Sequence, residues 1–152
     1  MKTREQGFTL IELLVAVAVI ALLVGIAIVN LHKAHLNSRE TVVAHEVQTV
    51  GQAQVQYLSQ YGRFAASLTE LGPPSAGTAG PQAAELIPAS LASGEKNGYR
   101  FTLALTPSGY SVNANPKVFG ADGRRTFYLD QNGTLHQNWG QEPASAESPE
   151  FQ

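Results

Sequence analysis

The chain has 152 residues and no cysteine, and this absence excludes several classes of protein at once. Without thiols there is no disulfide framework, no thiolate metal site and no cysteine nucleophile. Exported proteins can also lack disulfides, so the missing cysteines do not assign a compartment. Charged residues make up only 14% of the chain and its net charge is −2, which gives no overall attraction to nucleic acid. So little charge suits a subunit that packs much of its surface against copies of itself.

Proline is absent from residues 1–71, and glycine occurs there at only four positions. One long helix can therefore form, because the two residues that most disfavour helices are rare or missing. Within this range, residues 8–29 are apolar except for Thr9 and Glu12. As a helix this run would be ~33 Å long, enough to cross the roughly 30 Å hydrocarbon core of a bilayer.

Glu12 is the one charged residue of the apolar run. A carboxylate costs about 2.5–3.5 kcal/mol at the centre of a membrane and less near its surface, so Glu12 predicts a functional site with a partner. An ordinary secretory signal has an apolar region of roughly 7–15 residues followed by an A-x-A-like cleavage site. This run is longer, contains a glutamate, and continues past Val29 with a helical pattern instead of a small-residue cleavage site. Lys2 and Arg4 precede the run and Lys33 and Arg39 follow it, so charge alone leaves its orientation open.

Residues 30–61 have the pattern of an amphipathic helix, which predicts that the same helix continues into the core of a globular head. Apolar residues recur at helical spacing, with one gap at Gln54: Val43, Val47, Val50, Tyr57 and Tyr61. Polar residues are expected on the other faces: Glu40, His45, Glu46, Gln48, Gln52 and Gln56. Gly62 is a natural end for the helix, because glycine takes the left-handed conformation without a side-chain clash.

The remaining head, residues 62–140, has the pattern of an α+β fold. Ser67 and Glu70 have the spacing of a capping box before a short helix, and a glycine- and proline-rich loop follows. From Gly98 onward apolar and polar residues alternate, as in half-buried strands. We expect a small antiparallel sheet of about four strands packed on the long helix, at residues 99–106, 110–114, 126–130 and 134–139.

No pattern in the chain predicts a cofactor, a metal site or a catalytic group. His32 and His35 are one helical turn apart, but zinc needs three or four ligands and no third one is near. Asp122, Asp130 and Asn132 lack the twelve-residue spacing of a calcium loop, and turn chemistry explains them.

Two other groups of residues have a functional and a structural interpretation. Lys117, Arg124 and Arg125 predict a small solvated basic loop, whose footprint is too small to favour nucleic-acid binding. Ala21 and Gly25 form a small-xxx-small pair that would let two helices approach closely, or they are ordinary apolar filler.

The first residues of the chain resemble a known signal. Lys2 and Arg4, followed by Gly7-Phe8-Thr9-Leu10-Ile11-Glu12 and an uncharged apolar run, are similar to the class III leader of the type IV pilin and pseudopilin superfamily. Many members have a proline near the position of Val29, where their helix bends or melts in the filament. Its absence here removes the expectation of that kink.

The resemblance implies a pilin-like α+β fold and a set of processing steps. Prepilin peptidase would cleave after Gly7, the new terminus at Phe8 would be N-methylated, and Glu12 would meet the Phe8 amine of a neighbouring subunit in a filament. The implied organisation is a leader peptide at 1–7, a transmembrane and filament-core helix at 8–29, and the amphipathic half of that helix at 30–61. The head follows at 62–140, and residues 141–152, rich in Glu, Pro, Ser and Ala, are predicted to be a disordered tail.

The function implied by the resemblance is structural, without enzymatic activity. The chain would be a subunit of a type IV pilus, with copies of itself, other pilins, the prepilin peptidase and methyltransferase, and an inner-membrane assembly platform as partners. It would cross the inner membrane once with a cytoplasmic N-terminus, and then enter a pilus on the cell surface or a periplasmic pseudopilus. Two alternatives stay open: a pseudopilin of a type II secretion system and, more distantly, a membrane-anchored extracytoplasmic binding domain.

Overall fold

A computed structural model describes residues 8–151 of the chain, with side chains for residues 8–25 and 33–151. The leader predicted at 1–7, which includes Gly7, and the side chain of His32 lie outside the described residues. The chain forms two compact units, residues 1–35 and 36–152, and one helix contributes to both.

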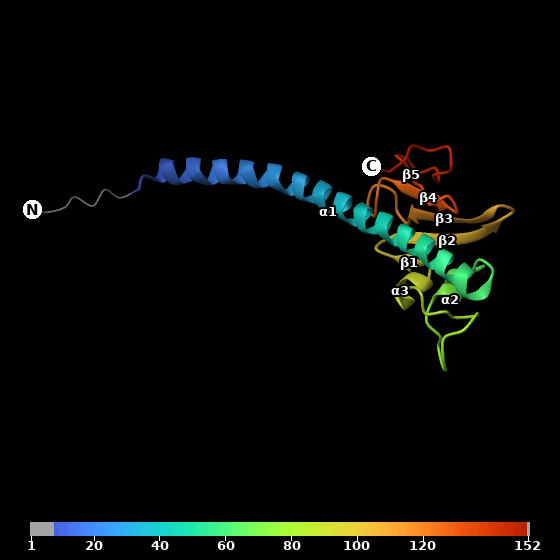
Figure 1. Ribbon diagram of the computed structural model, residues 1–152. Coiled ribbons are helices and arrows are strands. Elements are labelled where there is room, and N and C mark those ends of the chain that lie inside the picture. The colour runs from blue at the N-terminus through green and yellow to red at the C-terminus, as the bar shows by residue number, and fades with distance from the viewer. Residues whose placement is uncertain (1–7, 152) are drawn as a thin grey trace, which may run out of the picture. The chain divides into compact units, whose positions relative to one another are not determined.

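This helix, α1, spans Leu10–Tyr61 and is 52 residues long (Figure 1). No proline interrupts it, so no backbone donor is missing from its ladder of hydrogen bonds. It ends where the sequence predicts. The Gly62 N–H donates to the Leu58 carbonyl at 2.8 Å, and Gly62 has a φ of +70°. A residue with a side chain would be strained in that left-handed conformation.

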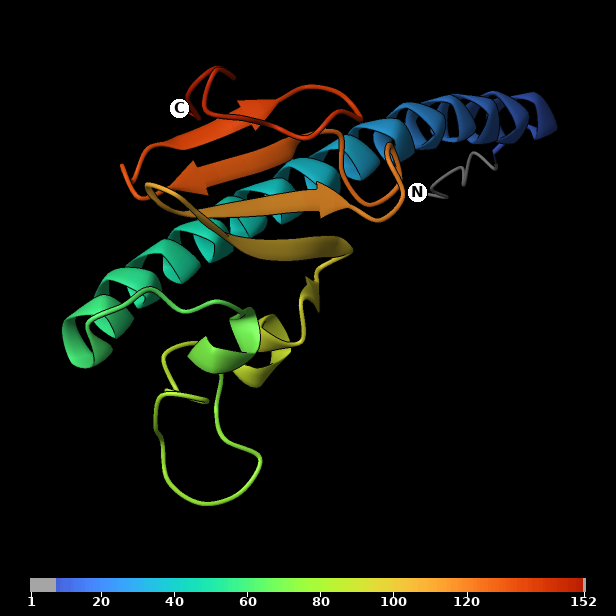
Figure 2. The same cartoon turned by 90° about the vertical axis from the view of Figure 1, so that its right-hand side faces the viewer.

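The second unit contains an antiparallel sheet of five strands in sequence order, which lie side by side across α1 in Figure 2. The strands are β1 Glu95–Lys96, β2 Tyr99–Thr106, β3 Gly109–Pro116, β4 Thr126–Asp130 and β5 Leu135–Asn138. The α+β, pilin-like fold is the predicted one, with five strands where about four were expected.

The additional strand, β1, is too short to show an alternating pattern in the sequence. It pairs with β2 through Lys96 and Tyr99, and the two residues between them form the turn. Asn97 and Gly98 have φ values of +52° and +78°. An Asn-Gly pair is favoured in such two-residue hairpins because both positions need a positive φ, so the sequence did contain the signal for this strand.

The core of the second unit lies between the sheet and the later part of α1. Four residues of the predicted helical stripe are fully buried: Val43, Val47, Val50 and Tyr57. The sheet contributes buried residues from four strands: Tyr99, Phe101, Tyr110, Val112, Ala114, Phe127, Leu129 and Leu135. The predicted alternation of β2 fades after Phe101, and Leu105 is exposed near the end of the strand.

Two one-turn helices, α2 (Leu68–Leu71) and α3 (Ala89–Ala92), lie beside this core. The predicted cap of α2 is present, since the Ser67 hydroxyl accepts from the Glu70 N–H at 3.3 Å. Helix α2 buries Leu68 and Leu71 in the core, and α3 buries Leu91. These contacts anchor both ends of the segment that contains the glycine- and proline-rich loop.

The last residues differ from the predicted disordered tail. The Phe151 N–H donates to the Leu135 carbonyl at 2.8 Å, and the Gln137 N–H donates to the Pro149 carbonyl at 2.8 Å. The Phe151 ring also lies 5.7 Å from the ring of Phe127. The composition of the segment predicts disorder, but β5 is an edge strand whose free backbone groups give the segment partners.

Candidate functional site

The first turn of α1 places Glu12 against Thr9. Glu12 Oε2 accepts hydrogen bonds from the Thr9 N–H at 2.9 Å and from the Thr9 hydroxyl at 2.7 Å. In return, the Glu12 N–H donates to Thr9 Oγ1 at 3.3 Å. This reciprocal pair is a capping box, which satisfies two backbone donors that a helix start leaves free.

The predicted site residues Phe8 and Glu12 are therefore close in the chain but are not paired with each other. Phe8 is 88% exposed, and among the described residues no hydrogen bond reaches Glu12 Oε1. The sequence reasoning did not assign a role to Thr9. The Thr-x-x-Glu spacing would have shown it, because it is the same spacing that predicts the Ser67 cap.

The apolar first part of α1 has an open groove along one face. Large and small residues line a groove of about 500 Å³ on one side of the helix: Leu10, Leu13, Leu14, Val17, Ala18 and Ala21. Gly25 lies one turn after Ala21, and no neighbouring atom lies within 4 Å of where its side chain would begin. The predicted helix-packing pair therefore lies along an open, apolar surface.

A search for helical stretches long and apolar enough to cross a membrane finds none among the residues whose side chains are described.

In the second unit, α1 is joined to the loop between β3 and β4 by a buried ion pair. Glu40 is fully buried, and its Oε2 accepts from Arg125 Nε at 2.7 Å. Its other oxygen accepts from the Arg124 N–H at 2.6 Å. The expectation that Glu40 lies on a polar outer face is therefore wrong. A buried carboxylate is tolerated because it is paired and hydrogen-bonded.

The predicted solvated basic loop is instead tied down by specific contacts. Arg124 donates to Asn37 Oδ1 at 2.9 Å, and Lys117 pairs with Glu95 at 2.7 Å. Asp122 accepts from Arg39 at 3.3 Å. The prediction of a solvated loop was wrong because the partners on α1 are far away in the sequence.

Two more polar residues of α1 are buried with partners in the head. Glu46 pairs with Lys96 at 2.7 Å and accepts from Asn97 Nδ2 at 3.1 Å. Gln54, the gap in the apolar stripe, is fully buried and holds both backbone groups of Ala65, each at 2.9 Å. Gln54 thus fixes the chain just after the end of α1.

Glu70 is the centre of a further network beside that end. Its Oε2 accepts from Arg63 at 2.8 Å, from the Ala66 N–H at 3.2 Å and from the Tyr57 hydroxyl at 3.1 Å. Burial alone would raise the pKa of Glu70, but these hydrogen bonds hold it below the ordinary value. Burial, together with the Glu70 carboxylate, raises the pKa of Tyr57. The network joins α1 to the segment before α2.

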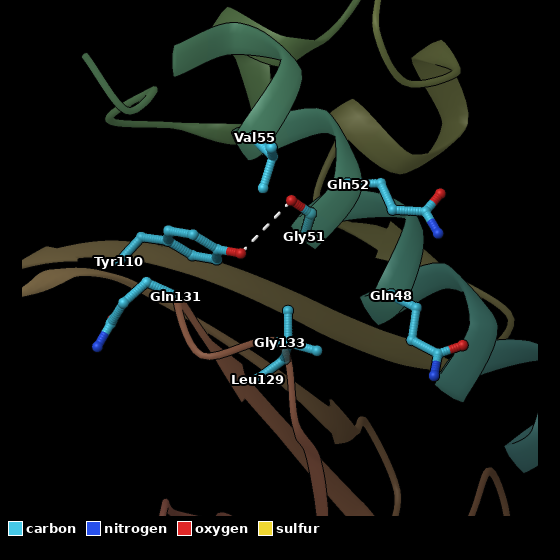
Figure 3. A pocket seen from close by; sticks show the side chains of 8 residues that line it. All are labelled: Gln48, Gly51, Gln52, Val55, Tyr110, Leu129, Gln131 and Gly133. Carbon is cyan, nitrogen blue, oxygen red and sulfur yellow. Dashed lines mark hydrogen bonds between the residues drawn. The ribbon is translucent and has the colours of Figure 1, made fainter. Parts of the chain in front are cut away.

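The head also has an open pocket of about 300 Å³ between α1 and the turn that joins β4 to β5 (Figure 3). The Tyr110 hydroxyl donates to the Gly51 carbonyl across it at 3.4 Å. Its other lining residues are neutral: Gln48, Gln52, Val55, Leu129, Gln131 and Gly133. None of these side chains can act as a general acid or base near neutral pH, so the pocket suits packing better than chemistry.

Among the side chains of residues 8–25 and 33–151, no three of His, Cys, Asp or Glu gather as metal ligands. Asp130 instead accepts from the backbone N–H of Asn132 at 2.9 Å, which is the turn role that the sequence predicts.

Residues 2–28 match the family model described as the prokaryotic N-terminal methylation motif. Over 69 residues the chain is 35% identical to the "Type IV major pilin protein PilA" of Myxococcus xanthus (strain DK1622). This alignment covers 45% of the chain and 31% of the relative, so the chain matches less than a third of that protein's length. No solved structure matches the chain.

The matched motif includes Phe8, Thr9 and Glu12, the residues at the start of α1. In the same chain this helix is followed by an antiparallel sheet with an α+β, pilin-like arrangement. The motif, the fold and the likeness to a major pilin agree, and together they support a relation to the type IV pilin superfamily.

Proposed function

We propose that this chain is a structural subunit of a type IV pilus and that it polymerises through the first half of α1. The observation that carries the proposal is the apolar surface of residues 13–25, all of which are exposed, directly after the Thr9–Glu12 pair. So large an exposed apolar surface is favourable only in lipid or against other protein. A bilayer would cover it before assembly, and a bundle of the same helices would cover it afterwards.

Processing would supply a cationic partner for the Glu12 carboxylate. Cleavage after Gly7 by prepilin peptidase would create an amine at Phe8, which the same enzyme system would then N-methylate. That amine carries a positive charge, and Glu12 Oε1 has no hydrogen bond among the described residues. A contact from Phe8 of one subunit to Glu12 of the next is heterologous, so its repetition generates a helical filament.

Ala21 and Gly25 would let neighbouring helices approach closely within that filament. Small residues at this spacing allow backbones to come together and gain van der Waals contact where lipid offers no hydrophobic driving force. The groove that ends at Ala21 supports this role, because a neighbour's larger side chains can fill it.

The proposed location follows from the same steps. The chain would cross the inner membrane once through residues 8–29, with its N-terminus in the cytoplasm, until an assembly platform moves it into a filament. Its partners would be copies of itself, other pilins and the processing enzymes. We assign it no enzymatic activity and no cofactor.

A pseudopilin of a type II secretion system is the second candidate, because it would use the same motif and helix. The likeness to a protein named as a major pilin favours the pilus. A membrane-anchored binding domain is the more distant alternative, and the neutral lining of the head's pocket gives it little support.

Electron microscopy of sheared surface filaments, with mass spectrometry of their subunit, tests the proposal. We expect filaments whose subunit starts at an N-methylated Phe8. A subunit that starts at Met1, or one cut after an alanine such as Ala27, would contradict the processing. Cells with processed protein and no surface filaments would favour the pseudopilin.

A further inference from the structure

One end of the sheet carries exposed apolar side chains that are not part of the buried core. Trp139 is 61% exposed, Val118 is 57% exposed and Phe119 is 38% exposed. The loop 117–125 leaves the end of β3 and enters β4, and the first residue of β4 pairs with Asn138, so Trp139 lies at this same end. We call Val118, Phe119 and Trp139 the basal patch.

The basal patch belongs to the end of the head at which α1 enters it. The loop 117–125 lies beside the first residues of α1 in this unit in both views (Figure 1; Figure 2). Three contacts hold it there: Arg39 with Asp122, Asn37 with Arg124, and Glu40 with Arg125. The buried Glu40–Arg125 pair makes the position of the loop a fixed property of the fold.

The side chains around Trp139 are cationic. The guanidinium carbon of Arg125 lies 4.5 Å from the centre of the indole ring, and that of Arg124 lies 5.9 Å from it. Two carboxylates at this end are paired, Asp122 with Arg39 and Glu40 with Arg125, and a third, Glu142, is exposed. Arg124 Nε is buried and has no hydrogen-bond partner among the described residues. A tryptophan beside arginines is typical of the zone where hydrocarbon meets phosphate headgroups.

The length of chain between the apolar run and this end limits their separation. Val29 ends the run, and Asn37 is eight residues later in the same helix. Eight residues of helix span ~12 Å, about the depth of one headgroup layer with its adjoining water. If residues 8–29 are in a bilayer, as proposed above, the start of the head is therefore close to its surface.

We propose that the basal patch docks on the phospholipid interface while the subunit is anchored in the membrane before assembly. Val118, Phe119 and the indole of Trp139 would enter the headgroup layer, and Arg124 would meet a lipid phosphate. Glu142 also reaches this end, since its carbonyl accepts from Thr126. The apolar side chains rather than net charge would therefore dominate the contact, and added salt would weaken it little. This inference depends on the proposed membrane anchor.

Trp139 is the only tryptophan of the chain, so its fluorescence reports the basal patch directly. The full chain would be reconstituted in vesicles of phosphatidylethanolamine and phosphatidylglycerol, with and without lipid that carries a nitroxide at the headgroup. We expect the nitroxide lipid to reduce Trp139 emission by about twofold, because indole rings settle at headgroup depth. Flotation of the vesicles, measured in parallel, reports whether the chain is anchored at all.

Variants separate the patch from the anchor. A chain with Val118→Ser and Phe119→Ser should still float with the vesicles but lose most of the quenching. Val55→Ser, which removes an exposed apolar residue on α1 in the second unit, should leave the quenching unchanged.

Two results would overturn the inference while leaving the proposed function intact. The first is a chain that floats with Trp139 unquenched by the nitroxide lipid and fully open to acrylamide. The second is a Trp139 that is protected from acrylamide without quenching by the lipid, which would assign the patch to a second copy of the chain. A chain that fails to float would instead contradict the membrane anchor and the proposed function.

Discussion

The two halves of α1 belong to one helix, but the side chains described in the first half are exposed and the apolar stripe of the second half is buried. In residues 13–25 all side chains are apolar and exposed, and the helix itself offers them no cover. In residues 36–61 the apolar stripe is buried under the sheet, and even charged residues are enclosed. The first half therefore needs an environment from outside the chain, whereas the second half already has one.

Glu12 and Glu40 show the difference most clearly. Glu12 is exposed, and its hydrogen bonds come from Thr9, within the same turn. Glu40 is fully buried, and its partners Arg124 and Arg125 come from a loop more than eighty residues later. Both carboxylate oxygens of Glu40 are therefore used within the fold, whereas Glu12 Oε1 has no hydrogen bond among the described residues.

The largest effect on stability is expected from Glu40. Glu40→Ala would leave Arg125 buried without its partner, which costs roughly 3–5 kcal/mol in the free energy of unfolding. Urea unfolding in detergent, followed by Trp139 fluorescence, measures this loss, since Trp139 lies on Arg125. Glu12→Ala is the matched comparison and should leave the unfolding of the head unchanged. If Glu40→Ala and Glu12→Ala lost the same free energy of unfolding, the distinction between the two halves of α1 would be wrong.

Gln54 should show a smaller effect of the same kind. Gln54→Leu keeps an apolar group of similar size but leaves the N–H and carbonyl of Ala65 buried without partners. We expect a loss of about 2–3 kcal/mol in the free energy of unfolding. Gln56→Leu, at an exposed position of the same helix, is the control. A loss below that of Gln56→Leu would mean that water replaces the amide.

The smallest effect is a pH dependence from Glu70. The pKa of Glu70 is lower in the folded chain than the ordinary value of 4.5. Its contribution to the free energy of unfolding is therefore fully present above pH 4.5. The contribution is lost as the pH falls through the lower, folded pKa. Because Arg63 and Glu70 are partly exposed, we expect under about 1 kcal/mol. The urea midpoint, measured at successive pH values, should depend less on pH in Glu70→Gln than in the unmodified chain. An equal loss of pH dependence in Glu142→Gln, an exposed carboxylate, would contradict the assignment.

Local patterns in the sequence predict most of this fold. The extent of α1, its end at Gly62, the Ser67 cap and the residues of β4 follow from spacing and residue type alone. These features depend on neighbours within a few residues, which the sequence displays directly. β1 was missed although Asn97-Gly98 signals its hairpin, because two residues are too few to alternate.

The buried polar contacts could not be predicted in this way. Glu40 and Glu46 have the polar character of an outer helix face, and Gln54 is a polar gap in the apolar stripe. Their partners lie 11 to 85 residues away. Only the folded chain brings such partners together. At the start of α1 the Thr9–Glu12 cap could have been predicted from its Thr-x-x-Glu spacing, because both residues lie within one turn.

The assembly role of Glu12 is the central claim, and a comparison of Glu12→Ala with Thr9→Val tests it most directly. Thr9→Val removes the hydroxyl of the local cap but keeps the carboxylate for a neighbour's Phe8 amine. Glu12→Ala removes the carboxylate, and Glu12→Gln keeps its shape without the charge. The measurement is the ratio of processed protein in sheared filaments to processed protein in membranes. We expect all three variants to be cut after Gly7, with the ratio reduced about tenfold or more in both Glu12 variants and near the unmodified level in Thr9→Val. Equal ratios in Glu12→Ala and the unmodified chain, or equal losses in Glu12→Ala and Thr9→Val, would contradict a contact between subunits and leave Glu12 as a helix cap.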